Sequence, residues 1–102
     1  MIVYNTTFMV MDSVKDSFLS WVRTVYVPHA TQSRKLVAPM LTRIIGSAED
    51  GAESYAVQFR AHSEESLQEW KQEIGNALIN DMTRRFGQQV VGFSTMMDKL
   101  EL

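Results

Sequence analysis

Four polar side chains in two segments are the best candidates for holding a ligand. Asn5 and Thr7 stand two residues apart near the N-terminus, and Gln58 and Arg60 stand two residues apart further along the chain. Both segments are rich in β-branched and aromatic residues, which favour strands, and alternate residues of a strand point to the same side. Amide, hydroxyl and guanidinium groups on one apolar sheet face could orient a small, partly apolar molecule. Further candidates for this face, from two other segments, are Arg43 or Thr42 and Ser94.

A binding role is one of two interpretations of this group. The same residues could form a polar patch that is buried between two copies of the chain and satisfied by its own hydrogen bonds. Both interpretations require neighbouring strands to bring the four side chains together.

The two histidines are the candidates for proton transfer near neutral pH. His29 follows Pro28 and His62 ends a predicted strand, and neither belongs to a His-x-x-x-His pair or an acidic ligand set, so we expect no metal site. Gly-x-Ser-x-Gly, Gly-x-Gly-x-x-Gly and Walker-type motifs are absent, which leaves no serine elbow and no phosphate cradle. The roles of Tyr4 and Tyr26 stay open, because a phenol can orient a ligand but more often satisfies a buried backbone group.

The composition excludes several classes of protein. A chain of 102 residues, 45% apolar and 22% charged, is expected to form one globular domain over residues 1–102. A net charge of -2 without a Lys/Arg run argues against a nucleic-acid partner. The absence of cysteine excludes disulfides and Cys-ligated clusters. No segment resembles a signal peptide or a membrane span, so we expect no membrane partner and a cytoplasmic location.

The first eleven residues are apolar on both of their alternating sides. Ile2, Tyr4, Phe8 and Val10 share one side, and Val3, Met9 and Met11 share the other. A strand that is apolar on both faces needs cover on both. Because the rest of the chain offers helices for only one face, we expect a homodimer in which a second copy covers the open sheet face.

Periodicity and turn residues mark the remaining elements. Apolar residues at three- and four-residue spacing predict two helices. Gly75 lies inside the second helix and is expected to allow close packing on a strand. The predicted elements are a first helix that Asp12 or Ser13 caps and that ends or kinks at Pro28, a helical tail or loop over 29–37, strands over 38–47 and 53–62, a second helix capped by Ser63 and ended by Gly87, and a strand over 89–97.

The predicted order is βαββαβ, which is the ferredoxin-like pattern of an α+β domain. It gives a four-stranded antiparallel sheet in the order 4-1-3-2 with both helices on one face. In that order the first and third strands are neighbours, so Asn5 and Thr7 lie beside Gln58 and Arg60.

Four phrases of the chain resemble a known family over almost its whole length. They are Met-Ile-Val-Tyr-Asn-Thr-Thr at 1–7, Phe-Leu-Ser-Trp-Val at 18–22, Ser-Tyr-Ala-Val-Gln-Phe at 54–59 and Arg-Arg-Phe-Gly at 84–87. The family is the domain-of-unknown-function family numbered 4286, whose members often have His-Ile-Pro where this chain has Tyr26-Val27-Pro28. The resemblance implies a layout similar to the dimeric α+β barrel group and implies no particular reaction. That group includes cofactor-free monooxygenases, haem-binding relatives, isomerases and small-molecule sensor domains.

These observations support three hypotheses. The leading one is a small dimer that binds a small, partly apolar molecule on the open sheet face, without a cofactor. The second is a cofactor-free monooxygenase- or isomerase-like enzyme that uses His29, His62 or Tyr4 for proton transfer, which requires a histidine inside a cavity. The third is a structural or protein-interaction module whose open face is dry and filled. Only the two histidines could serve as a haem ligand, which makes haem binding a weak alternative.

Overall fold

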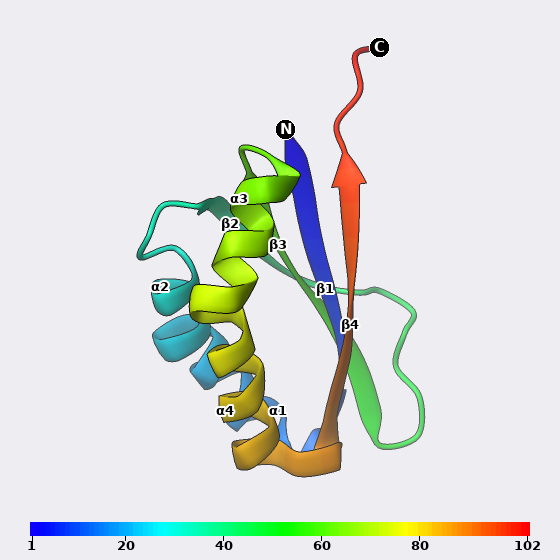
Figure 1. The fold of residues 1–102 in the computed structure, drawn as a ribbon. Helices are drawn as coiled ribbons and strands as arrows, with labels where there is room; N and C mark the ends of the chain where they lie inside the picture. The colour runs from blue at the N-terminus through cyan, green and yellow to red at the C-terminus, as the bar shows by residue number, and fades with distance from the viewer.

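Four strands form one antiparallel sheet in the order β2-β3-β1-β4, and helices cover one of its faces (Figure 1). The structure, a computed structural model, describes residues 1–102. It confirms the predicted ferredoxin-like α+β fold, including the strand order and the βαββαβ succession. The elements are β1 (Ile2–Met11), η1 (Asp12–Val14), α1 (Lys15–Trp21), η2 (Val22–Tyr26), α2 (Val27–Ala30), β2 (Leu36–Arg43), β3 (Ala52–Ala61), α3 (Glu64–Trp70), η3 (Lys71–Gly75), α4 (Asn76–Phe86), η4 (Gly87–Gln89) and β4 (Val90–Asp98).

The central strand β1 buries alternate residues under the helices, as its sequence predicts. Phe8 and Val10 are fully buried, and Thr6 is the one buried polar side chain of the domain. The intervening residues, among them Asn5 and Thr7, point to the opposite face, which no helix covers (Figure 1). We call this second face of the sheet the open face.

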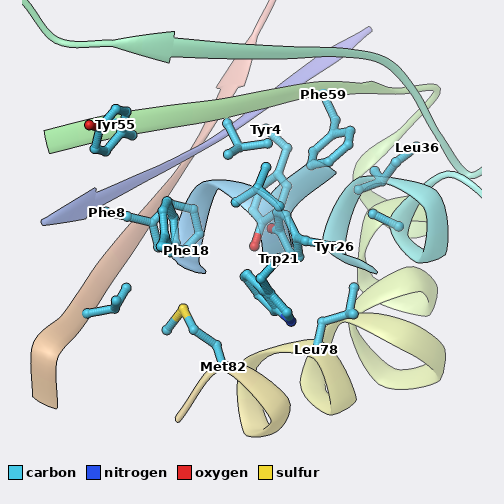
Figure 2. Close-up of a cluster of buried hydrophobic side chains, with 14 of the residues drawn as sticks. Tyr4, Phe8, Phe18, Trp21, Tyr26, Leu36, Tyr55, Phe59, Leu78 and Met82 are labelled. Atoms are coloured by element: carbon cyan, nitrogen blue, oxygen red, sulfur yellow. The ribbon is translucent and has the colours of Figure 1, made fainter. Parts of the chain in front are cut away.

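Aromatic side chains fill the space between the sheet and the helices (Figure 2). Phe18 packs against Phe8 with ring centroids 5.2 Å apart, and Trp21 stacks on Tyr26 at 5.1 Å. Burying a large apolar side chain of this kind contributes about 1.5–3 kcal/mol to stability. The core therefore lies on one side of the sheet only and does not involve the open face.

The first helix continues through Pro28, where the sequence predicts an end or a kink. Residues Val22–Tyr26 form a π turn, in which the N–H of Val27 donates to the carbonyl of Val22. Proline lacks an N–H and its ring clashes with a carbonyl of the preceding turn in a regular α-helix. A π turn changes the position of that carbonyl, so the helix can continue as α2 to Ala30.

The end of α2 is tied to the second helix. The indole Nε1–H of Trp70, a buried residue of α3, donates to the carbonyl of Ala30 at 2.8 Å. This bond satisfies a carbonyl that has no partner within its own helix. None of the helices is both long and apolar enough to cross a membrane.

The second helix begins as predicted and contains a second π turn. The N–H of Ser66 donates to Oγ of Ser63 at 3.1 Å, which confirms the predicted N-cap. Gly75 ends the π turn Lys71–Gly75, and a Cβ at this position would lie 2.6 Å from the Trp70 ring. Close packing at Gly75 is therefore confirmed, but the neighbour is a side chain of the same helix and not a strand.

Strand β2 contains a bulge that the alternation of its residues does not predict. Val37 pairs with Arg60 and Met40 pairs with Gln58, so three steps along β2 match two steps along β3. Ala38 has a positive φ of 54°, and Pro39 has no N–H to donate to a ladder. Such an extra residue reverses which side chains face each side of the sheet beyond it.

Candidate functional site

The four leading candidates meet on the open face, on the two central strands. Asn5 pairs with Gln58, and the side chains of both are half-buried. Arg60 lies opposite Val3 at one end of the group, and its side chain is exposed. The Asn5 Nδ2 donates to the Thr7 hydroxyl at 3.2 Å, which is the one side-chain hydrogen bond within the group.

Large apolar side chains of β1, β2 and β4 surround this polar group. They point to the open face and are 41–66% exposed, with Phe93 the most exposed. A monomeric protein rarely leaves so many large apolar side chains together in water. The members of this set are Met9, Met11, Val37, Met40, Val91, Phe93 and Met97.

Ser94 lies on the other side of the sheet, so its predicted place on the open face is wrong. It pairs with Thr6, and their hydroxyl oxygens are 2.8 Å apart. The hydroxyl of Tyr4 donates to Oγ of Ser94 at 3.1 Å. Since Thr6 points toward the helices, its partner in the register points there too.

Thr95 occupies the open-face position that was predicted for Ser94. It pairs with Asn5 on the side away from Gln58, so one row of polar residues crosses β3, β1 and β4. The sequence already indicated this position, because Thr95 lies at every second residue with Val91, Phe93 and Met97 and so shares their side of the strand.

Arg43 also lies on the helix-facing side, and its predicted place on the open face is wrong. In a regular strand Arg43 would lie on the same face as Val37, the open face, because their positions differ by an even number of residues. The bulge between Val37 and Met40 adds one residue and so turns Arg43 to the other face. Arg43 instead pairs with Tyr55 and lies 3.4 Å from the carboxylate of Glu53. Thr42, the alternative to Arg43, pairs with Ala56 and lies on the open face.

The two tyrosines belong to the core. Burial raises the pKa of Tyr26, the nearby Tyr4 raises it further, and a hydrogen bond with Thr6 opposes both effects. Figure 2 shows both phenol rings between the sheet and Trp21. The Tyr4 hydroxyl is satisfied by Ser94, and the ammonium of Lys71 lies 5.4 Å from the centre of the Tyr4 ring. Neither tyrosine reaches the open face.

Both histidines are exposed, and they lie in separate hollows. His29 lines a hollow of about 330 Å³ between α2 and α4, where its Nδ1 is 2.8 Å from the carbonyl oxygen of Val25. His62 lines another, beside Ser63 and Glu64. No group of three or more His, Asp or Glu side chains is placed to hold a metal ion. Exposed imidazoles do not meet the requirement of the enzymatic hypothesis for a histidine inside a cavity.

The fold is shared with solved structures of low sequence identity. An ethyl tert-butyl ether D (EthD) family protein from Bacillus halodurans matches with a TM-score of 0.71 at 19% identity, over 98% of this chain and 100% of that one. A dimeric ferredoxin-like protein from an uncultured marine organism matches with a TM-score of 0.63 at 13% identity, over 100% and 99%. An antibiotic biosynthesis monooxygenase matches with a TM-score of 0.63 at 14% identity, over 99% and 100%.

These likenesses show the fold and leave the function open. No curated protein matches the chain in sequence. The family model described as "Domain of unknown function (DUF4286)" matches residues 1–100. The chain therefore belongs to this family of unknown function, as the four phrases of its sequence predict.

Proposed function

We propose that the protein is a homodimer whose two sheets meet through their open faces and enclose a binding site for a small, partly apolar molecule. The observation that carries the proposal is a polar row on an uncovered sheet face that also exposes many large apolar side chains. Asn5, Gln58 and Thr95 form the row, and Arg60 lies at its edge.

A second copy is the occupant that best suits this face. The apolar residues come from both edge strands, β2 and β4, and from β1 between them, so a partner must cover the whole width of the sheet. A sheet of the same shape and composition provides such a surface through two-fold symmetry. The dimeric ferredoxin-like protein with the same fold supports this choice.

The polar groups are the reason to propose a ligand and not only a filled interface. Gln58 and Arg60 have no side-chain hydrogen bond or ion pair within the chain, although Gln58 is half-buried already. Covering these groups in a dimer without new partners costs about 1–3 kcal/mol for a neutral group and more for a charged one. A ligand with an anionic end and an apolar body would satisfy Arg60 and contact the surrounding methionines.

The dimer is tested by measuring mass in solution. We expect light scattering to give twice 11.7 kDa for the wild type and a monomer for Phe93→Glu, which puts a charge in the apolar face. Ile79→Glu is the control, because Ile79 is also an exposed large apolar residue but lies on α4. A monomeric wild type, or equal dissociation of both variants, would contradict the proposal.

The ligand is tested by thermal-shift screening with a panel of small aromatic and aliphatic carboxylates. We expect at least one to stabilise the wild-type dimer, and Arg60→Gln to weaken its binding by at least about tenfold, since losing a charge-assisted hydrogen bond costs about 1.5–3 kcal/mol. Arg34→Gln, which removes the same charge from a loop, should have no effect. A dimer that responds to none of the panel would instead support an interface whose polar row is satisfied internally.

A further inference from the structure

A hollow of about 480 Å³ lies on the helix-facing side of the sheet, between α1 and the edge strand β2. Lys15 and Leu19 of α1 and Arg23 of η2 line one wall. Leu41 and Arg43 of β2 line the other, so apolar and cationic side chains face each other across it. The open face is on the opposite side of the sheet, and a dimer formed there leaves this hollow accessible.

The helix wall gathers two cations around an apolar residue. Lys15, Leu19 and Arg23 follow at intervals of four residues, which places them along one side of the helix. Neither cation has an ion-pair partner, because the salt bridges of the chain involve only Lys35, Arg43, Arg84 and Arg85 on the basic side. Two unpaired positive charges therefore border the same hollow in a chain of net charge -2.

The carboxylate of Glu53 orients the third cation without neutralising the site. It accepts a hydrogen bond from the Tyr55 hydroxyl at 2.9 Å and lies 3.4 Å from the guanidinium of Arg43. The Tyr55 hydroxyl, and then Arg43, lower the pKa of Glu53, so this group stays ionised at neutral pH. Three cations and one carboxylate line the hollow, which leaves it with a charge of about +2.

We propose that this hollow binds a small organic anion, with its carboxylate or phosphate group held by Lys15, Arg23 and Arg43. Guanidinium groups bind planar and tetrahedral oxyanions through paired N–H donors, and an ammonium adds a point charge. The apolar body of the ligand lies between Leu19 and Leu41. The site is independent of the open face, so either proposal can fail without the other.

The test is an NMR titration of the wild-type protein with benzoate and, separately, with phenyl phosphate. We expect saturable shifts confined to amides around the hollow, with the tighter ligand identifying the preferred anionic group. Arg23→Gln and Arg43→Gln should each raise the dissociation constant at least threefold. Arg34→Gln is the matched control, since it removes a cation from a loop, and it should leave the dissociation constant unchanged.

Glu53→Gln should change anion binding in the opposite direction. Removing the one carboxylate of the hollow should lower the dissociation constant at least twofold, although the variant loses the ionic partner of Arg43. Glu65→Gln, an exposed position at the start of α3, should have no such effect. Shifts that do not saturate with either ligand, or an Arg34→Gln effect as large as that of Arg23→Gln, would overturn the proposal.

Discussion

The stability of the fold depends on pH through the phenol of Tyr26. Its ring is stacked on Trp21 and only 1% of the residue is exposed, so the folded chain strongly favours the neutral form. Burial is the largest cause of its raised pKa, and the ordinary value of 10.0 applies once the chain unfolds.

This shift predicts a loss of stability in alkaline solution. The contribution of Tyr26 to the free energy of unfolding is complete below pH 10. Above pH 10 it falls by about 1.4 kcal/mol per pH unit, because only the unfolded chain then releases the proton. Tyr26→Phe should remove this part of the slope in urea unfolding at pH 9–11. Parallel losses in wild type and variant would contradict the prediction.

Gly75 illustrates a residue whose neighbour overrides its helix propensity. Alanine is favoured over glycine in a helix by about 1 kcal/mol, yet a methyl group here meets the Trp70 ring. Because Trp70 is fixed by its bond to Ala30, we expect Gly75→Ala to destabilise the protein by about 1–3 kcal/mol. Urea unfolding measures this, with Asn80→Ala at an exposed site of α4 as the control. An unchanged or higher stability of Gly75→Ala would show that the ring can move.

At the scale of the elements, Asp81 links the two helices. Its Oδ2 accepts a hydrogen bond from the Trp21 Nε1–H at 2.9 Å, so a residue of α4 holds a residue of α1. Arg84 and Arg85 pair with the same carboxylate from its own helix. The bond from Trp21 is the largest cause of the lowered pKa of Asp81.

Removing this link should destabilise the packing of the helices. We expect Asp81→Ala to cost about 1–3 kcal/mol in urea unfolding, and Asp81→Asn to cost less because an amide oxygen still accepts the indole bond. The wild type should lose the contribution of this charge as the pH falls below the ordinary carboxyl value of 3.8. Asp16→Ala, an exposed acidic site on α1, is the control. Equal stability of Asp81→Ala and Asp16→Ala would argue against the link.

At the scale of the whole molecule, the sheet has a core on one side and uncovered apolar residues on the other. If the open faces pair, folding and association are coupled, so stability depends on protein concentration. We expect the urea concentration at the unfolding midpoint to rise with protein concentration. The free energy of unfolding rises by about 1.4 kcal/mol of dimer for each tenfold increase in protein concentration. Phe93→Glu should show no such dependence and Ile79→Glu should keep it. A midpoint independent of concentration in the wild type would contradict the coupling.

The order of the elements and most of their faces follow from the amino-acid sequence alone. Alternation in β1 and β3 assigns Asn5, Thr7, Gln58 and Arg60 to one side of the sheet, since the period of a strand is fixed by its backbone. The Ser63 cap is equally local, because its hydrogen bond spans three residues.

Features that depend on contacts between distant residues emerge only in the folded chain. The bulge at Ala38 and Pro39 turned Arg43 to the helix-facing side. The passage of the helix through Pro28 and the cationic hollow beside Glu53 also lie outside any local pattern. Register and parity are set by which residues pair across strands, and a single inserted residue changes them without a clear signal in the sequence.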